Sequence, residues 1–135
     1  MGKAHEAREA LKSFLEKHGF SVEHRGSLRG ASGIVHVFDL VAVKGDTVLC
    51  FDFACADEDS VLRAAVKAMD VRGARVFLLL DQACPSNAPV SLEGKVRVSI
   101  VFFEGTEDLL EKVGSAIAQL SLSDAQLESL ETADR

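Results

Sequence analysis

The chain has 135 residues, a length that suits one domain. Apolar residues make up 47% of it and charged residues 27%, a balance typical of a folded globular protein and not of a disordered one. No apolar run approaches the roughly 18 residues that a membrane-spanning helix needs. The charged N-terminus has no secretory apolar core, so we expect a cytoplasmic protein without a membrane segment.

The net charge of −6 is unevenly distributed along the chain. Residues 1–36 carry six Lys or Arg against four acids, whereas the remainder carries nine against seventeen. The chain has no Tyr or Trp, so no surface for stacking bases is visible. Only the first third of the chain is therefore expected to tolerate nucleic acid, and with weak affinity.

Hydrophobic spacing predicts the elements in order, beginning with a helix that ends before Gly19. The apolar positions of this helix are Ala4, Ala7, Leu11, Phe14 and Leu15. A short edge strand follows over 20–24, and the glycine-rich segment 25–33 is expected to be a loop. Two apolar strands over 34–43 and 47–55 flank Gly45-Asp46, a typical hairpin signal.

In the second half of the sequence, hydrophobic spacing predicts a helix, two further strands and a C-terminal helix. The first of these helices is capped by Asp57 or Asp59, and its expected buried stripe is Val61, Leu62, Ala65, Val66 and Met69. Strands are expected over 76–80 and 96–103, joined by a long connection over 81–95 that holds both prolines. Thr106 is expected to cap a helix with the stripe Leu109, Leu110, Val113, Ala116, Ile117 and Leu120.

The capping-box pattern at Ser123-Asp-Ala-Gln126 predicts a separate short acidic helix or tail over 123–135, after a single domain over 1–122. A hairpin followed by a helical crossover and further strands predicts an α/β fold, a mixed sheet flanked by helices on both faces. The three cysteines, Cys50, Cys55 and Cys84, lack a CxxC spacing, and the first two lie in an apolar strand. We expect inert thiols, with neither a disulfide framework nor a zinc site.

Two carboxylates lie inside the predicted central strands, Asp39 and Asp52, where acidic residues are rare. If Gly45-Asp46 forms the turn, Lys44 pairs with Thr47, and the same register places Asp39 opposite Asp52. The two side chains would then share one face of the sheet, with Cβ atoms about 4.5–5.5 Å apart. Like charges this close need a proton or a cation between them, and two such carboxylates suit Mg²⁺ or Mn²⁺. The alternative is that both acids lie at strand ends, solvated or bonded to the backbone.

These residues carry a resemblance to a known superfamily. A first helix ending in Gly-Phe20, a glycine-rich loop, the strand Ser32-Gly-Ile-Val-His-Val-Phe-Asp39, and a second strand with Asp52 follow one another. Over about residues 4–103 the chain resembles the restriction-endonuclease-like, PD-(D/E)XK, superfamily, especially its archaeal Holliday-junction-resolvase-like and Mrr-like branches. The resemblance implies an αβββαβ core, with Asp39 and Asp52 as ligands of a divalent metal.

The sequence departs from that superfamily at one position. The lysine expected two residues after the second acid is replaced by Ala54, which cannot polarise a water or stabilise phosphorane charge. Lys67 on the following helix is a candidate for a relocated lysine, although its position beside the buried stripe favours a solvated surface residue. Glu6 and Glu9 could supply a further carboxylate from the first helix, but we expect them at the surface.

Three more groups are candidates for a metal ligand, a phosphate cradle and a nucleic-acid face. His36 lies on the opposite strand face from Asp39, which favours a hydrogen-bonded core or edge histidine over a metal ligand. The Gly30–Gly33 loop lacks a following helix and a GKS/T motif, so a flexible turn is favoured over a phosphate cradle. Lys12, Arg25 and Arg29 form the candidate nucleic-acid face.

Three functional hypotheses follow. The first is a nuclease-fold protein with impaired or lost cleavage, acting as an accessory or assembly subunit in nucleic-acid processing. The second is an active Mg²⁺- or Mn²⁺-dependent endonuclease in which Lys67 replaces the missing lysine. The third is a protein–protein module, a homodimer or a partner-binding protein, which uses the acidic segment 104–135, where two basic residues face eight acidic ones.

Overall fold

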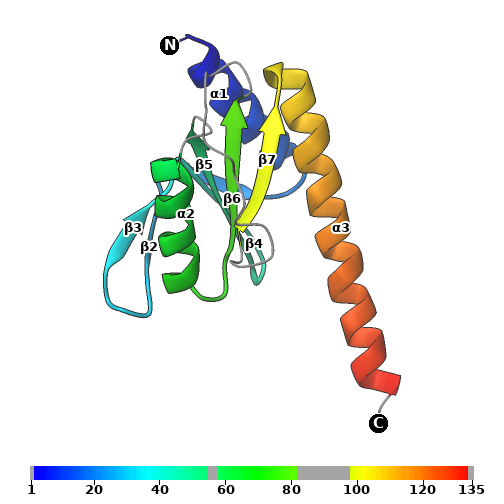
Figure 1. Ribbon diagram of the computed structural model, residues 1–135. Helices are drawn as coiled ribbons and strands as arrows, with labels where there is room; N and C mark the ends of the chain where they lie inside the picture. The colour runs from blue at the N-terminus through cyan, green and yellow to red at the C-terminus, as the bar shows by residue number, and fades with distance from the viewer. Residues whose placement is uncertain (1, 55–57, 82–97, 134–135) are drawn as a thin grey trace.

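The computed structural model describes residues 2–54, 58–81 and 98–133. Its helices are α1 (Gly2–Lys17), α2 (Glu58–Asp70) and α3 (Gly105–Ala133). Its strands are β1 (Ser21–His24), β2 (Ser27–Arg29), β3 (Val35–Val37), β4 (Leu40–Lys44), β5 (Thr47–Ala54), β6 (Arg75–Asp81) and β7 (Val98–Phe103). Five strands form one sheet in the order β1-β4-β5-β6-β7, and β2 pairs with β3 in a separate ribbon (Figure 1).

The central sheet is mixed. β1, β4 and β5 are antiparallel neighbours, whereas β5, β6 and β7 run parallel, with α2 connecting β5 to β6. Gly45, with φ of +60°, begins the two-residue turn that the sequence predicted, so Lys44 pairs with Thr47. The register continues to the pair Leu40 and Phe51, which confirms the predicted alignment of the hairpin as far as Leu40, the residue that follows Asp39 in the sequence.

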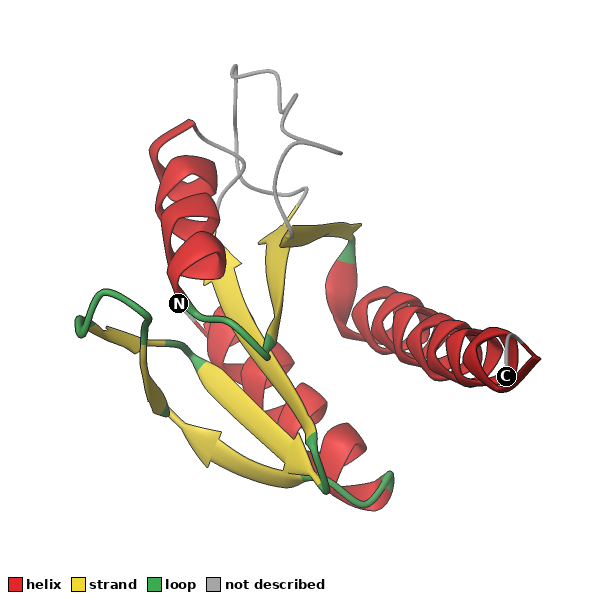
Figure 2. Cartoon of the chain, turned by 90° about the horizontal axis from the view of Figure 1, so that it is seen from below, coloured by secondary structure: helices red, strands yellow, loops and turns green. Residues whose placement is uncertain are grey.

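Helices cover both faces of this sheet, as Figures 1 and 2 show. α1 and α3 pack on one face through Leu11, Leu15 and Leu109, against sheet residues such as Phe51 and Phe77. α2 covers the other face, where its buried residues meet β4, β5 and β6. The predicted α/β class, a mixed sheet flanked by helices, is thus confirmed.

The segment between β1 and β4 differs from the prediction. The expected loop 25–33 contains β2, and the expected single strand 34–43 is broken into β3 and β4 at Phe38 and Asp39. The break arises because the backbone of these two residues bonds elsewhere: Phe38 N–H donates to the Gly26 carbonyl, and the Asp39 carbonyl accepts from Arg25 N–H, each at 2.9 Å. The β2–β3 hairpin therefore leaves the main sheet and lies beside α2 (Figure 1).

Helix α2 is also oriented differently from the prediction. Its sheet-facing side consists of Val61 and three alanines, Ala64, Ala65 and Ala68, which allow close approach to the strands. Three members of the predicted buried stripe, Leu62, Val66 and Met69, are instead 48%, 61% and 68% exposed.

Helix α3 runs without interruption to Ala133, so no separate element begins at Ser123. No Gly or Pro occurs after Gly114, so nothing in the sequence ends the helix at the predicted break. The helix begins at Gly105 and not after Thr106, and the Asp108 carboxylate accepts the Glu104 N–H at 2.9 Å. Within the described parts of the chain, no helix has the length and apolar character needed to cross a membrane.

Candidate active site

Asp39 and Asp52 meet at the end of the antiparallel part of the sheet. Asp39 is the residue immediately before β4, and Asp52 lies within β5, one position beyond the last β4–β5 pair. Both side chains line one pocket of about 500 Å³. The sequence register therefore located the two acids correctly relative to each other.

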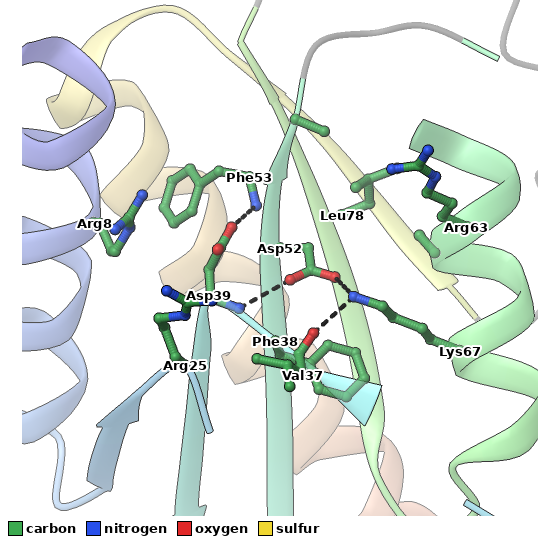
Figure 3. A pocket seen from close by; sticks show the side chains of 12 residues that line it. Arg8, Arg25, Val37, Phe38, Asp39, Asp52, Phe53, Arg63, Lys67 and Leu78 are labelled. Carbon is green, nitrogen blue, oxygen red and sulfur yellow. Dashed lines mark hydrogen bonds and ion pairs between the residues drawn. The ribbon is translucent and has the colours of Figure 1, made fainter. Parts of the chain in front are cut away.

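The two carboxylates do not converge on a single point between them. The Asp52 Oδ1 atom accepts the Asp39 N–H at 2.9 Å, and the Asp39 Oδ2 atom accepts the Phe53 N–H at 2.8 Å (Figure 3). Each carboxylate thus accepts a hydrogen bond from the backbone of the opposite segment. These bonds satisfy two backbone donors at the point where β3 and β4 separate.

Lys67 on α2 completes this arrangement. Its Nζ atom donates to Asp52 Oδ2 at 2.9 Å and to the Val37 carbonyl at 2.7 Å, and it lies 4.9 Å from the centre of the Phe38 ring (Figure 3). The side chain is 25% exposed and paired with Asp52, so the expected solvated surface lysine is wrong, and the Lys67 ammonium lies beside the second acid. The ammonium balances the charge of Asp52. The sequence led us to expect a proton or a cation between the two acids for this purpose.

The pocket is rich in cations. Arg8 from α1, Arg25 from the β1–β2 turn and Arg63 from α2 line it together with Lys67, so four cationic side chains surround two carboxylates. Figure 3 shows Arg8 and Arg25 on the Asp39 side, and Arg63 with Lys67 on the Asp52 side. The Arg8 Nε atom is buried without a hydrogen-bond partner among the described residues. Guanidinium groups arranged in this way suit an anionic ligand whose oxygens accept hydrogen bonds from them.

The backbone around Arg25 holds its side chain at the pocket. Arg25 has φ of +52°, a left-handed conformation that is unusual for a residue with a side chain. Its N–H bonds to the Asp39 carbonyl at 2.9 Å. A Cβ added to the next residue, Gly26, would lie 2.7 Å from Val41 Cγ2, so only glycine fits there. The turn is therefore fixed in a strained form that directs Arg25 to the acids.

A second cluster anchors the tip of the β2–β3 hairpin to the end of α2. The Asp70 carboxylate accepts the Ser32 hydroxyl at 2.7 Å and the Ser32 N–H at 2.8 Å, and lies 2.7 Å from His36 Nε2. The hydrogen bonds from Ser32, followed by that from His36, lower the Asp70 pKa from 3.8 to about 2. His36 thus has the structural, hydrogen-bonded role that the sequence favoured. The Gly30–Gly33 loop contacts Asp70 and has no phosphate-cradling geometry of its own.

The remaining predicted residues lie outside the pocket. Lys12 and Arg29 do not line it, so of the candidate nucleic-acid face only Arg25 reaches the acids. Glu6 and Glu9 are exposed on α1, as expected, and Glu9 lies 3.2 Å from His24 Nε2.

Sequence reasoning missed Arg8 and Arg63, although one signal was present. Arg63 precedes Lys67 by four residues, which places both on one side of α2. Arg8 follows the buried Ala7 in α1 and had no comparable pattern.

Cys50 lies next to this site but is inert. It is a free cysteine with a fully buried side chain, and burial, with a smaller contribution from the Asp52 charge, raises its pKa to about 12. The thiol is protonated at neutral pH, as the sequence predicted for this residue. Cys55 and Cys84 lie outside the described residues.

Asp39 and Asp52 carry the kind of oxygen that Mg²⁺ binds, but three of their oxygens already accept bonds from Phe53 N–H, Asp39 N–H and Lys67. Among the described residues, no group of three or more His, Cys, Asp or Glu side chains is arranged to hold a metal ion. Mg²⁺ commonly retains several waters and binds proteins through one or two carboxylates, so these two acids are the residues that would hold it. Lys67 occupies Asp52 Oδ2, so a cation on that oxygen would share or displace the ammonium.

These features define an α/β protein with a partly buried acid–lysine pair in a cationic pocket. No known family model matches the sequence, and no curated protein matches it. Among solved structures, the fold is similar to that of AF1548, a protein of unknown function, with a TM-score of 0.52 and 18% sequence identity. The match covers 80% of this chain and 66% of the AF1548 chain, so this chain spans less than two thirds of that protein. At this identity the similarity shows the fold alone.

Proposed function

We propose that the chain is a nucleic-acid-binding protein of the restriction-endonuclease-like type that hydrolyses phosphodiesters with Mg²⁺ or Mn²⁺. The observation that carries this proposal is the bond of 2.9 Å between Lys67 Nζ and Asp52 Oδ2 inside a pocket shared with Asp39. Ala54 stands where the superfamily has its lysine, and Lys67 on α2 places an ammonium beside the second acid instead.

The residues have separable roles. Asp39 and Asp52 would hold the divalent ion, which supplies Lewis-acid activation of water and of the scissile phosphate. Lys67 orients the attacking water from the Asp52 side and stabilises the negative charge that develops on the phosphorane. Arg8, Arg25 and Arg63 hold the phosphates of the bound strand and fix it in line with that water.

A nuclease assay tests this proposal. Branched, single-stranded and duplex DNA are incubated with the protein and Mg²⁺ or Mn²⁺, and products are resolved on a denaturing gel. We expect cleavage by the wild type, loss of cleavage in Asp39→Asn and Lys67→Ala, and wild-type rates in Arg72→Gln, whose arginine is exposed and outside the pocket. Melting temperatures of all variants separate loss of chemistry from loss of folding.

A binding subunit without cleavage is the second candidate. Two observations favour it: Ala54 lines the pocket where the superfamily has its lysine, and the Lys67 ammonium already neutralises Asp52. In that case the wild type binds nucleic acid and leaves it intact with either metal. Wild-type protein that neither binds nor cleaves any of the three DNA forms would refute both candidates.

A further inference from the structure

The β2–β3 hairpin presents an apolar outer face to solvent. Pairing of Arg29 with Val35 and of Ser27 with Val37 places these four residues on one face, and all four are exposed. Val35 and Val37 are 52% and 45% exposed. Leu28 and His36 form the opposite face, which is partly buried.

This outer face is continuous with the pocket. Val37 and Arg25, at the two ends of the hairpin base, both line the pocket beside Asp39 (Figure 3). Val35 and Arg29 follow on the same face, one pair further from the acids. A linear ligand that leaves the pocket past Val37 would therefore pass along this face.

The hairpin is held rigidly enough to act as a platform. Lys67 bonds to the Val37 carbonyl at its base, and Asp70 bonds to Ser32 and His36 toward its tip. Both anchors come from α2, so the hairpin keeps its position relative to Asp52 and Lys67. A surface that is already ordered binds with a smaller entropic cost.

The charge of the hairpin distinguishes it from the rest of the chain. Residues 25–38 contain two arginines, Arg25 and Arg29, and no Asp or Glu, although the whole chain has a net charge of −6. A face that combines arginines with aliphatic side chains matches a strand whose phosphates are anionic and whose bases are exposed. In an intact duplex the bases stack on one another, whereas an unpaired strand leaves their faces open to contact with side chains such as Val35 and Val37.

We propose that the outer face of the β2–β3 hairpin binds unpaired nucleotides adjacent to the phosphate held in the pocket. Val35 and Val37 contact base and sugar faces, and Arg29 contacts a neighbouring phosphate. This inference rests on the proposed function and makes it more specific: the substrate is single-stranded or branched nucleic acid, and the hairpin sets that preference.

Binding measurements without a cleavage-supporting metal test the inference. Fluorescence anisotropy in EDTA compares a labelled single-stranded oligonucleotide with the duplex of the same sequence. The double variant Val35→Thr/Val37→Thr removes apolar contact from the outer face without changing charge. Val66→Thr is the matched control, because Val66 is 61% exposed on α2 and does not line the pocket.

We expect the double variant to lose about fivefold or more in affinity for the single strand and to change little toward the duplex. Val66→Thr should bind both as the wild type does. Equal losses toward both DNA forms, no loss, or a matching loss in Val66→Thr would overturn the inference while leaving the proposed function intact. So would wild-type dimers in light scattering that Val35→Thr/Val37→Thr dissociates, since the face would then bind a second copy. Wild-type protein that binds neither form refutes the proposed function itself.

Discussion

At the scale of single residues, each acid of the site serves two purposes. Asp52 bonds to the Asp39 N–H through one oxygen and to Lys67 through the other, and Asp39 bonds to the Phe53 N–H. Truncation to alanine would leave partly buried backbone donors unpaired, at a cost of about 1–3 kcal/mol each. Substitution by asparagine keeps an acceptor at the same place, so Asp39→Asn tests chemistry with less structural damage.

Arg25 allows binding and stability to be separated. Its φ of +52° strains an arginine but not a glycine. We therefore expect the free energy of unfolding of Arg25→Gly to equal that of the wild type or to exceed it by up to about 1 kcal/mol. The same change removes one guanidinium from the pocket and should weaken binding of single-stranded DNA. Urea denaturation and anisotropy measure the two effects; a clear loss of stability would show that the Arg25 side chain supports the fold.

Cys50 should be unreactive in the folded protein. Its burial and its pKa of about 12 leave almost no thiolate at pH 8. We expect iodoacetamide to modify Cys50 only after denaturation, which peptide mass mapping distinguishes from modification of Cys55 and Cys84. Rapid modification of Cys50 under native conditions would show that β5 opens readily.

At the scale of elements, the β2–β3 hairpin depends on its contact with the end of α2. The Asp70 pKa is about 2 in the folded chain and about 3.8 when unperturbed, so the ionised form stabilises the fold. This contribution is complete above about pH 4 and is lost as the pH falls toward 2. We expect the melting temperatures of the wild type and Asp70→Asn to differ most above pH 4 and to converge at lower pH.

Gly30 is the position at which this contact is most sensitive to substitution. A Cβ at residue 30 would overlap the Asp70 carboxylate, so Gly30→Ala should displace the hairpin tip and destabilise the protein by about 1–3 kcal/mol. Gly33→Ala is a useful comparison: Gly33, unlike Gly30, has a positive φ, and nothing lies within 4 Å of its Cβ position, so its cost comes from backbone strain alone. Chemical denaturation of the two variants should therefore rank Gly30→Ala as the more destabilised.

The sequence predicted the hairpin register and the relation between the acids because both depend on local signals. A two-residue Gly-Asp turn fixes every pair of an antiparallel hairpin, and Asp39 and Asp52 follow from it. The break at Phe38 was not predictable from alternation, since it depends on bonds to Gly26 and Arg25 from another segment. Lys67 was misjudged for the same reason: its partners, Asp52 and the Val37 carbonyl, come from tertiary packing and not from its position on the helix.

At the scale of the whole molecule, metal binding should raise stability without any need for turnover. A ligand that binds only the folded state must increase the melting temperature. We expect Mn²⁺ to raise the melting temperature of the wild type, and Asp39→Asn to reduce that rise. Ca²⁺ and a chelator control for ionic strength, and an unchanged wild-type melting temperature over a wide Mn²⁺ range would argue against the two-aspartate site.

The reciprocal bonds between Asp39, Asp52 and the two strands have an evolutionary consequence. Both acids bond to backbone N–H groups where the β4–β5 pairing ends, whether or not a phosphate is ever cleaved. Selection for folding alone would therefore retain them. On the proposed function, a descendant of this chain that had lost cleavage and binding would keep the pair of aspartates and lose the guanidinium groups first. The arginines that line the pocket, more than the two aspartates, would then indicate whether such a protein still binds phosphates.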